Sequence, residues 1–270
     1  MVLFDTHMHL QDPGLYPRRE TVVRRAKEAG VCRMLCCGTH EADWPVVAEL
    51  AREFPGVVLP AFGLHPMFLG NRSAQWLDRL SSFLDEWPEA AIGETGLDRQ
   101  LEPRDDAEQE TVFRTQCELS FDRKRPLIVH ARRVTERMLE LLRSAGPHPC
   151  GYVLHSFGGP AEVVPAYIQL NAFFSFSGSV TRPESRRVQT ALRAVPADRL
   201  LLETDAPCIR VFQPDAPASA DPASEPADLV HVAEAAARIR GEPITHLAAN
   251  TETHARQLLT PDWLPQFADY

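Results

Sequence analysis

The chain has 270 residues, of which 44% are hydrophobic and 24% are charged, and its formal net charge is −9. This length suits one large domain, and this composition excludes a disordered chain. The negative charge gives no general attraction to nucleic acid or to anionic membranes, so a polyanionic substrate would have to be held by local positive charge or by metal.

Short apolar runs alternate with longer amphipathic segments along almost the whole chain. The runs predict β-strands at residues 2–5, 33–37, 57–63, 90–93, 127–129, 152–154, 173–176 and 200–202. Between the runs, apolar residues at helical spacing predict helices, for example through Val22, Val23, Ala26 and Ala29. Two further helices are expected at residues 227–239 and 245–258.

Strands that alternate with helices predict a parallel sheet with right-handed crossovers. Eight such strands at this length favour an α/β fold of the (β/α)₈ type, a TIM barrel, with residues 1–270 forming a single domain. A doubly wound open sheet is the alternative, and it would gather ligands near one switch point. The candidate ligands described below come from the first, fourth, fifth, sixth and eighth strands. Only a closed ring brings the first and last strands together, which favours the barrel.

One segment departs from this alternation of strands and helices. Residues 213–226 (QPDAPASADPASEP) are rich in proline, alanine, serine and aspartate and cannot form the interior of a helix. Because the segment follows the last predicted strand, we expect a long loop over the mouth of the barrel.

The cysteines and the apolar runs indicate the compartment. The six cysteines form no CxxC pair, and Cys36 and Cys37 are adjacent in a strand-like run, where buried free thiols are expected. The sequence contains neither a signal peptide nor a run of about 20 apolar residues. We therefore expect a cytoplasmic protein that crosses no membrane and has no stable protein partner.

Side chains that commonly bind metals occur at the exits of five predicted strands. His7 and His9 are two residues apart, so both should point to the same side of the first strand. The other candidates are Glu94, His130, His155 and Asp205. Because active sites in barrels lie at the carboxyl-terminal ends of the strands, we expect all of these side chains at one face.

Four imidazoles and two carboxylates exceed the ligand set of one tetrahedral zinc ion. They suit two divalent ions about 3.5–4 Å apart that are bridged by a carboxylate and by water. Glu94 is the best candidate for the bridge because an imidazole does not bind two metals. A bridging lysine is excluded because Lys27 and Lys124 do not lie at strand exits. The donors do not distinguish zinc, manganese, nickel, iron and magnesium.

Six short motifs occur in order between residues 2 and 210. They are Asp5-Thr6-His7-Met8-His9-Leu10, Gly63-Leu64-His65-Pro66, Gly93-Glu94-Thr95-Gly96-Leu97-Asp98, Val129-His130-Ala131-Arg132, His155-Ser156-Phe157-Gly158-Gly159 and Glu203-Thr204-Asp205-Ala206-Pro207. Together they resemble the TatD-type metal-dependent hydrolases of the amidohydrolase superfamily. The resemblance implies a (β/α)₈ barrel, a divalent and usually binuclear metal site, and deoxyribonuclease-like hydrolysis of phosphodiesters. The ligands that it implies are His7, His9, Glu94, His130, His155 and Asp205.

The sequence departs from the common pattern of this family at positions that are not predicted ligands. Arg99 stands where an aromatic residue is often found, and Met67 where a histidine is frequent. The segment Ala223-Ser224-Glu225-Pro226 replaces Arg-Asn-Glu-Pro, and His254 replaces an asparagine. These departures concern the substrate rather than the metal chemistry.

The expected mechanism uses a hydroxide that bridges the metal ions, formed because the ions lower the pKa of a shared water toward about 7. The expected catalytic residues are Asp205, which would accept the proton of that water and pass it to the leaving group, and Glu94. We expect His65 and Arg132 to contact the phosphate, the structural alternatives being a loop-capping imidazole and a solvated helix start.

Other residues are expected around this site. Glu203 is expected to orient a ligand histidine, and Asp98 could do likewise. Trp44, Phe68 and Phe157 are candidate stacking surfaces for bases, although each could instead belong to the core.

These residues predict a divalent-metal-dependent phosphodiesterase that acts on DNA ends or on other small phosphodiesters. An ester or amide hydrolase, for example an aminoacyl deacylase, is the alternative, because the same hydroxide could attack carbon. A non-catalytic binding protein is disfavoured, since it would not need six converging donors.

Overall fold

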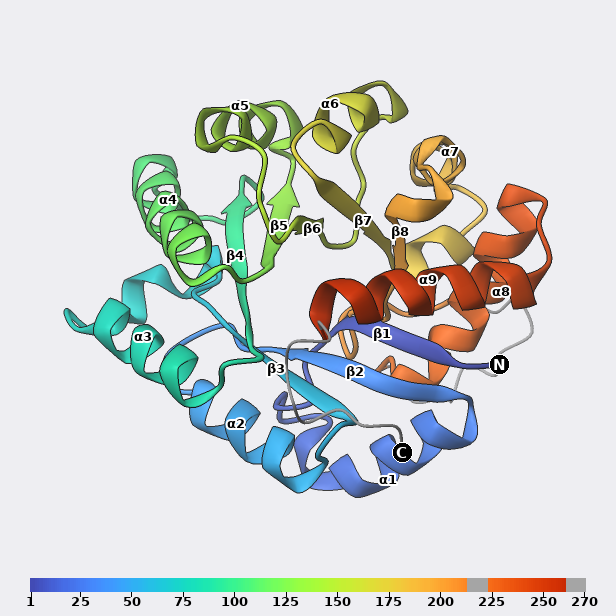
Figure 1. Ribbon diagram of the computed structural model, residues 1–270, viewed down its shortest axis with the longest axis horizontal. Coiled ribbons are helices and arrows are strands. Elements are labelled where there is room, and N and C mark those ends of the chain that lie inside the picture. The colour runs from blue at the N-terminus through green and yellow to red at the C-terminus, as the bar shows by residue number, and fades with distance from the viewer. Residues whose placement is uncertain (213–222, 261–270) are drawn as a thin grey trace.

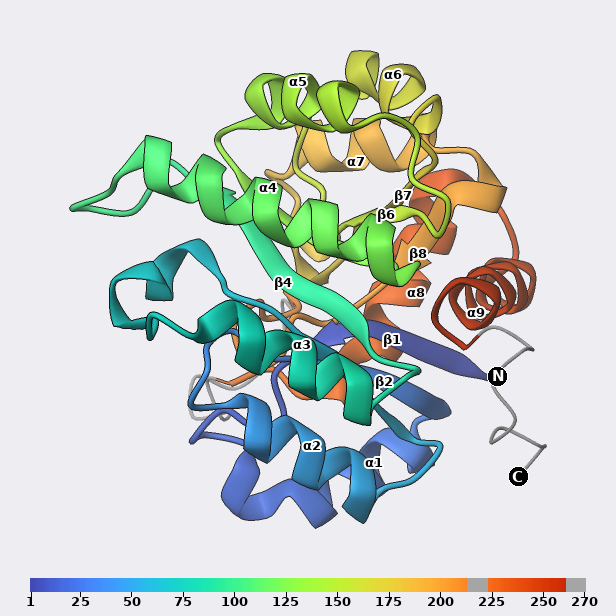
Figure 2. The same cartoon turned by 60° about the vertical axis from the view of Figure 1, so that its left-hand side comes forward.

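The computed structural model describes residues 1–212 and 223–260. In this part of the chain, eight parallel strands follow one another around the sheet in chain order, and helices surround them (Figures 1 and 2). The strands are β1 (Leu3–Met8), β2 (Val31–Cys37), β3 (Val58–Phe62), β4 (Ala91–Asp98), β5 (Leu127–Arg132), β6 (Tyr152–Leu154), β7 (Ala172–Phe176) and β8 (Leu200–Leu202). This sequential order confirms the predicted TIM barrel, because a doubly wound sheet would reverse its strand order.

The helices alternate with the strands as the sequence predicts. They are α1 (Arg19–Glu28), α2 (Trp44–Glu53), α3 (Trp76–Glu86), α4 (Asp106–Arg123), α5 (Thr135–Ala145), α6 (Val164–Ile168), α7 (Arg186–Ala194), α8 (Leu229–Arg240) and α9 (Ile244–Leu259). The helices expected at 227–239 and 245–258 correspond to α8 and α9. Most of the long loop expected at residues 213–226 lies outside the described residues. Within the described ranges, no helix is both long enough and apolar enough to span a bilayer.

Three strands extend beyond their predicted ends. β1 continues to Met8, β4 to Asp98 and β5 to Arg132, so the candidate ligands His7, Glu94 and His130 lie within strands rather than after them. Every residue of β1 and β4 is buried, although several carry polar side chains. The predicted strands ended where the apolar runs ended, whereas the backbone hydrogen bonds between neighbouring strands continue through the polar residues.

The ring closes between β1 and the segment that follows β8. The backbone N–H of Asp205 donates to the carbonyl oxygen of His7 at 2.9 Å, and that of His9 donates to the carbonyl of Ala206 at 2.8 Å. The hydroxyl of Thr6 donates to the carbonyl of Leu202 at 3.0 Å. These hydrogen bonds bring the candidate ligands of the first and last strands to the same place.

The interior of the barrel is apolar at one end and polar at the other. Side chains from β1, β2, β3, β4, β5, β6 and β8 form an inner cluster that also includes Ala255 and Leu259 of α9. In Figure 1, α9 crosses in front of the strands, so this helix closes the amino-terminal end of the ring. The polar candidates therefore occupy the opposite, carboxyl-terminal end.

The long helix α4 was not among the helices named from apolar spacing, because the face that it buries is partly polar. Gln116 accepts from the backbone N–H of Leu64 at 2.8 Å and donates to the carbonyl of Leu64 at 3.1 Å. Gln109 pairs in the same way with the backbone of Asp98, at 2.9 and 3.2 Å. Both glutamines fix the ends of strands next to the candidate site.

His148 is a buried structural histidine, and it makes the stability of the fold depend on pH. Its Nδ1 accepts from the backbone N–H of Cys150 at 3.0 Å, and its Nε2 lies 2.9 Å from the hydroxyl of Ser120. Burial lowers its pKa to about 4. Because the unfolded chain takes up the proton near pH 6.5 and the folded chain only near pH 4, the free energy of unfolding should fall as the pH drops through this window.

The expected effect of His148→Gln is a shallower pH dependence. The slope of the unfolding free energy between pH 4 and 6.5 should decrease by up to about 1.4 kcal/mol per pH unit, because the substituted side chain does not titrate. Urea unfolding of both proteins at several pH values measures the two slopes. Equal pH dependence of the unfolding free energy in the two proteins would contradict the role assigned to His148.

Candidate metal centre

The structure brings all six predicted ligands together at the carboxyl-terminal end of the barrel. They border a cavity of about 400 Å³ or lie directly beneath it. His7 is fully buried, and Glu94, His155 and Asp205 expose less than a tenth of their surface. Convergence of this kind needs every one of these strands to end at the same face, as a closed parallel ring requires.

Glu94 lies at the centre, with different partners on its two carboxylate oxygens. Its Oε2 lies 3.2 Å from Nε2 of His7 and 3.4 Å from Nε2 of His9. Its Oε1 lies 2.8 Å from Nδ1 of His130 and 2.9 Å from Nε2 of His155. Asp205 joins the first side, where its Oδ1 is 3.4 Å from Nε2 of His9. The donors thus form two sets that share one carboxylate.

Glycines on both sides of Glu94 allow this placement. Gly93 and Gly96 have φ values of +137° and +154°, which favour glycine. A Cβ atom on Gly96 would lie 1.9 Å from the carbonyl oxygen of His130, and one on Gly93 would lie 2.7 Å from Ile128. The Gly-Glu-Thr-Gly motif therefore lets β4 approach β5 closely enough for Glu94 to reach His130.

Asp205 has a backbone conformation that is rare outside glycine, with φ of +52°. A neighbouring carboxylate holds the segment: Asp5 accepts hydrogen bonds from the backbone N–H of Thr204, at 2.9 Å, and from its hydroxyl. Burial raises the pKa of Asp5 to about 8. Asp5 belongs to a motif noted in the sequence, but its positioning role was missed, because only the closure of the ring brings it to Thr204.

Each of the four histidines has a partner for the ring nitrogen that faces away from Glu94, and for His7 this is Sγ of Cys37, 3.4 Å from Nδ1. Nδ1 of His9 lies 2.8 Å from the carbonyl of Cys37, and Nε2 of His130 lies 3.2 Å from Oδ2 of Asp98. Nδ1 of His155 lies 3.4 Å from Oε1 of Glu203. Histidine ligands of metals are commonly oriented by such carbonyl and carboxylate partners. Glu203 and Asp98 therefore each lie beside a candidate ligand histidine.

The imidazoles and carboxylates around Glu94 shift one another's pKa values. Burial opposes the charge of Glu94, but His155, His65 and His7 hold its pKa well below the ordinary value. Burial likewise disfavours a charged His9, but Asp205 and Glu94 raise its pKa to about 9. Imidazolium and carboxylate groups thus compensate one another when only protons are bound. A dication could replace those protons, because metal ions and protons compete for the same lone pairs.

The donor set fits divalent metals. Among the described residues, His7, His9 and Glu94 form one group whose potential ligand atoms all lie within 4.8 Å of one another. Two further groups combine His65 with Glu94 and His130, and His7 with His155 and Glu203. Mixed imidazole and carboxylate sets are typical of zinc, manganese, iron and nickel sites.

The two predicted phosphate contacts differ in position. His65 is buried, and its Nδ1 accepts from the backbone N–H of Met67 at 3.0 Å, so it is a loop-capping imidazole. Its Nε2 nevertheless lies 3.5 Å from Oε1 of Glu94, and burial lowers its pKa to about 3. Arg132 is exposed at the end of β5 and lines the mouth of the cavity.

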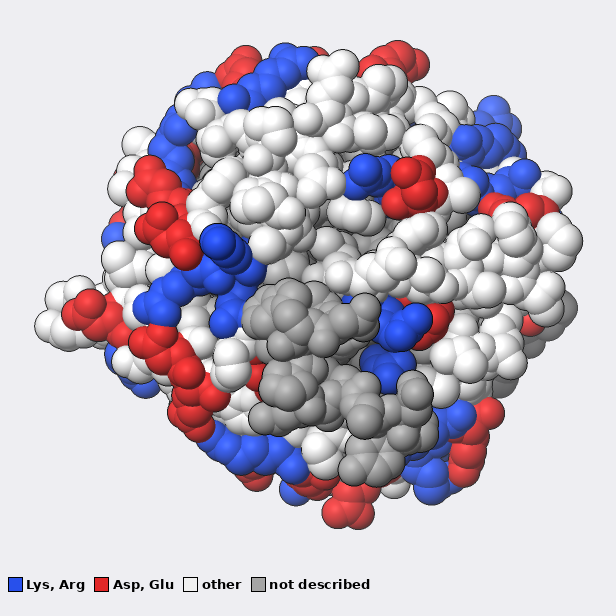
Figure 3. All heavy atoms as spheres, viewed as in Figure 1, with Lys and Arg blue, Asp and Glu red and all other residues white. Residues whose placement is uncertain are grey.

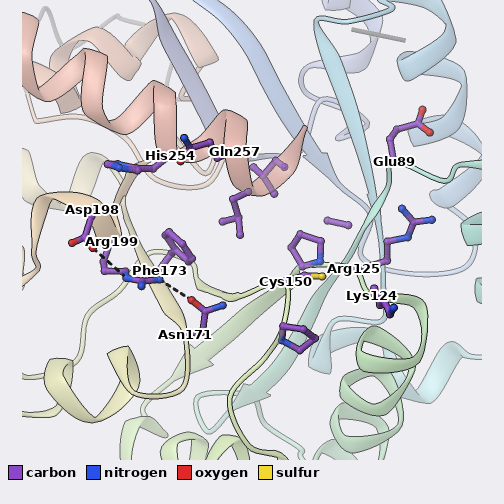
Figure 4. Close-up of a pocket in the computed structure, with 15 residues that line it drawn as sticks. Glu89, Lys124, Arg125, Cys150, Asn171, Phe173, Asp198, Arg199, His254 and Gln257 are labelled. Atoms are coloured by element: carbon purple, nitrogen blue, oxygen red, sulfur yellow. Dashed lines mark hydrogen bonds and ion pairs between the residues drawn. The ribbon is translucent and has the colours of Figure 1, made fainter. Parts of the chain in front are cut away.

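A second, larger cavity of about 520 Å³ lies at the amino-terminal end of the strands (Figure 4). Lys124, Arg125 and Arg199 border it, together with the apolar end of α9. Among the described residues, none of the potential metal groups includes a residue that lines this cavity. Active sites of barrels lie at the opposite, carboxyl-terminal face, so the smaller cavity is the candidate site.

The surface carries charges of both signs. In Figure 3, basic and acidic side chains alternate around the outline, and neither sign forms one continuous patch on that face. With a net charge of −9, attraction of an anionic substrate would depend on groups at the site itself.

Known proteins are similar to this chain in both sequence and fold. The family model described as TatD related DNase matches residues 4–260. The "3'-5' ssDNA/RNA exonuclease TatD" of Erwinia tasmaniensis is 30% identical over 95% of this chain and 99% of the relative. An "uncharacterized metal-dependent hydrolase" of Bacillus subtilis is also 30% identical, over 95% of this chain and 98% of the relative.

A solved structure of a related protein has the same fold as this chain. A TatD homologue from Escherichia coli K12 superposes with a TM-score of 0.88 at 26% identity, covering 95% of this chain and 97% of that protein. The relatives named here have nuclease or metal-dependent hydrolase names, which agree with the predicted phosphodiesterase rather than with the ester or amide hydrolase. The chain belongs to the TatD-related DNase family and is a metal-dependent hydrolase of the TatD type.

Proposed function

We propose that the protein is an exonuclease that removes nucleotides from the ends of single-stranded DNA with the help of two divalent ions. The observation that carries the proposal is the position of Glu94, whose two oxygens face separate sets of nitrogen donors. A carboxylate between two such sets could bind two ions at once, and two ions together can stabilise the attacking and leaving oxygens of a phosphodiester. The names of the exonuclease relatives support a nucleic acid as the substrate.

We propose that His7, His9 and Asp205 would hold one ion and His130 and His155 the other, and that Glu94 would be available to both. Bound there, divalent ions would neutralise charge on the phosphodiester and lower the pKa of water. The donors suit zinc, manganese, nickel or iron, and magnesium is the further candidate.

The side chains around the donors would handle the substrate and the proton. Asp205 would accept a proton from the attacking water and return it to the leaving oxygen, acting as a general base and then as an acid. His65, whose Nδ1 already accepts a hydrogen bond, would present an Nε2–H donor to a phosphate oxygen. Arg132, at the mouth, would pair with a phosphate of the incoming strand.

The shape of the cavity supports action at chain ends. Its volume of about 400 Å³ is in the range of pockets for small ligands, and the apolar core of the barrel lies beneath it. A pocket of this size above a packed core accommodates the end of a strand rather than the middle of a duplex.

We further propose a cytoplasmic location. All six cysteines are free thiols, and Cys36 and Cys37 are buried. Free thiols persist in reducing compartments.

The test uses the metal-loaded protein and a single-stranded oligodeoxynucleotide labelled at its 5' end. We expect progressive shortening from the 3' end that stops when a chelator is added and resumes when excess divalent metal is restored. Intact DNA under all metal conditions would contradict the proposal. Cleavage of an aminoacyl ester by the same preparation would then support the alternative hydrolase.

A further inference from the structure

Two aromatic rings, those of His40 and Phe68, stack on each other at the rim of the candidate site. Their centroids are 4.6 Å apart and their planes differ by 24°. Both side chains line the cavity of about 400 Å³ that contains the metal donors, and both are partly exposed. We call this pair the rim stack.

The rim stack is held in place by groups on two different loops. Nδ1 of His40 lies 3.2 Å from Oδ2 of Asp43 and 3.0 Å from the hydroxyl of Thr39. Phe68 belongs to a 3₁₀ helix, Pro66–Asn71, whose first N–H groups include the one bonded to Nδ1 of His65. A platform fixed on both sides loses little conformational entropy when a ligand stacks on it.

The rim stack is connected to the metal donors through His65. The ring of Phe68 lies 6.2 Å from that of His65 in an edge-to-face arrangement, and Nε2 of His65 lies 3.5 Å from Glu94. A phosphate held near His65 would therefore have the rim stack beside it. In a nucleotide, a sugar joins the phosphate to a flat aromatic base.

The other two aromatic candidates from the sequence belong to the core. Trp44 is fully buried and donates through Nε1 to the carbonyl of Gly63 at 3.0 Å. Phe157 is 6% exposed and packs edge-to-face against Phe174 and Tyr167. Of the three, only Phe68 offers a surface to the cavity.

We propose that the rim stack is a subsite for the nucleobase of a nucleotide flanking the scissile phosphodiester. The proposal rests on the proposed exonuclease function and adds a determinant of its substrate. Stacking suits a single strand of any sequence, because every base has a flat aromatic face. It also provides affinity without positive charge, which matters for a chain with a net charge of −9.

The test compares cleavage of single-stranded oligodeoxynucleotides that differ by one base. One carries all its bases, and two others carry an abasic sugar at the last or at the penultimate 3' position. For the wild-type protein, kcat/KM should be about tenfold lower for one of the two abasic substrates than for the complete oligonucleotide. Phe68→Ala should lower kcat/KM for the complete substrate by about the same factor and leave that abasic substrate unchanged.

Further variants distinguish the loss of aromatic stacking from the loss of side-chain volume and from damage to the fold. Phe68→Leu keeps an apolar side chain without the aromatic face and should behave like Phe68→Ala, whereas Phe68→Trp should restore the preference for the base. Phe212→Ala removes a phenylalanine that is 44% exposed and does not line the cavity, and it should keep the wild-type preference.

The outcomes distinguish the subsite from the function on which it rests. If Phe68→Ala lowers cleavage of complete and abasic substrates equally, or changes neither, the rim stack is a structural contact and the proposal is wrong. If the wild-type protein cleaves none of the oligonucleotides, the exonuclease function fails and the subsite fails with it.

Discussion

Replacing Glu94 with glutamine is expected to lower the metal-dependent kcat by at least about a thousandfold, because the metal ions supply several kcal/mol of transition-state stabilisation. Glutamine keeps the size of the side chain but removes the charge that both donor sets share. Its amide also has only one oxygen, whereas Oε1 and Oε2 of Glu94 face His130 and His7 respectively. Steady-state cleavage of a single-stranded oligonucleotide and the number of metal ions per chain measure the effect.

The matched control is Glu110→Gln on α4. Glu110 pairs with Arg137 at 2.6 Å, away from the cluster, and this substitution should preserve both activity and metal content. A Glu94→Gln protein that binds two ions and retains wild-type turnover would contradict the role of Glu94 as a shared ligand.

Asp205→Asn should lower kcat by about 10²- to 10⁴-fold, the usual contribution of a general base, with a smaller effect on KM. Burial opposes the charge of Asp205, but the interactions with His9, His155 and His7 lower its pKa, so the carboxylate is available as a base. The asparagine is nearly isosteric and cannot accept the proton. The pH profile of kcat provides the specific measurement, because its acidic limb should disappear.

Asp85→Asn, on the exposed side of α3 where Asp85 pairs with Arg123, is the control for a neutralised aspartate. It should retain the wild-type rate and profile. A rate within severalfold of wild type for Asp205→Asn, with the acidic limb intact, would assign the proton transfer to another group.

The alternation of apolar runs and amphipathic segments was sufficient to predict the barrel. All eight predicted strands are present, because a strand buried on both faces produces a continuous apolar run. The ends of β1, β4 and β5 were not predicted. There, polar residues such as His7 and Thr95 point into the site or toward α4, so burial and apolarity no longer coincide.

The ligand types and their places at strand ends were likewise visible in the sequence. Their convergence in the structure follows from the closure of the ring. The division of the donors into two sets around Glu94 depends on which oxygen faces which ring, and spacing along the chain does not encode that. The assignment of these residues as ligands is a prediction that a metal-bound structure can test.

The supporting residues were harder to recognise because their partners are distant in sequence. Gln116 bonds to the backbone 52 residues away, at Leu64. Asp5 bonds to Thr204 across 199 residues. The pairing of His40 with Phe68 joins the loops after β2 and β3. Phe68 was a candidate from the sequence, but no local pattern indicates that His40 is its partner. Such contacts arise from tertiary structure alone.

His65 shows that two interpretations of one residue need not exclude each other. The imidazole caps the start of a 3₁₀ helix through Nδ1 and directs Nε2 toward Glu94. The cap fixes which nitrogen carries the proton. The structural role therefore prepares the side chain for the phosphate contact that we propose.

The most direct test of the shared carboxylate is a crystal structure of the metal-loaded protein with anomalous diffraction data collected at the absorption edge of the metal. We expect two anomalous peaks, one beside His7, His9 and Asp205 and the other beside His130 and His155, with Glu94 in contact with both. A single peak, or two peaks that Glu94 does not join, would contradict the account.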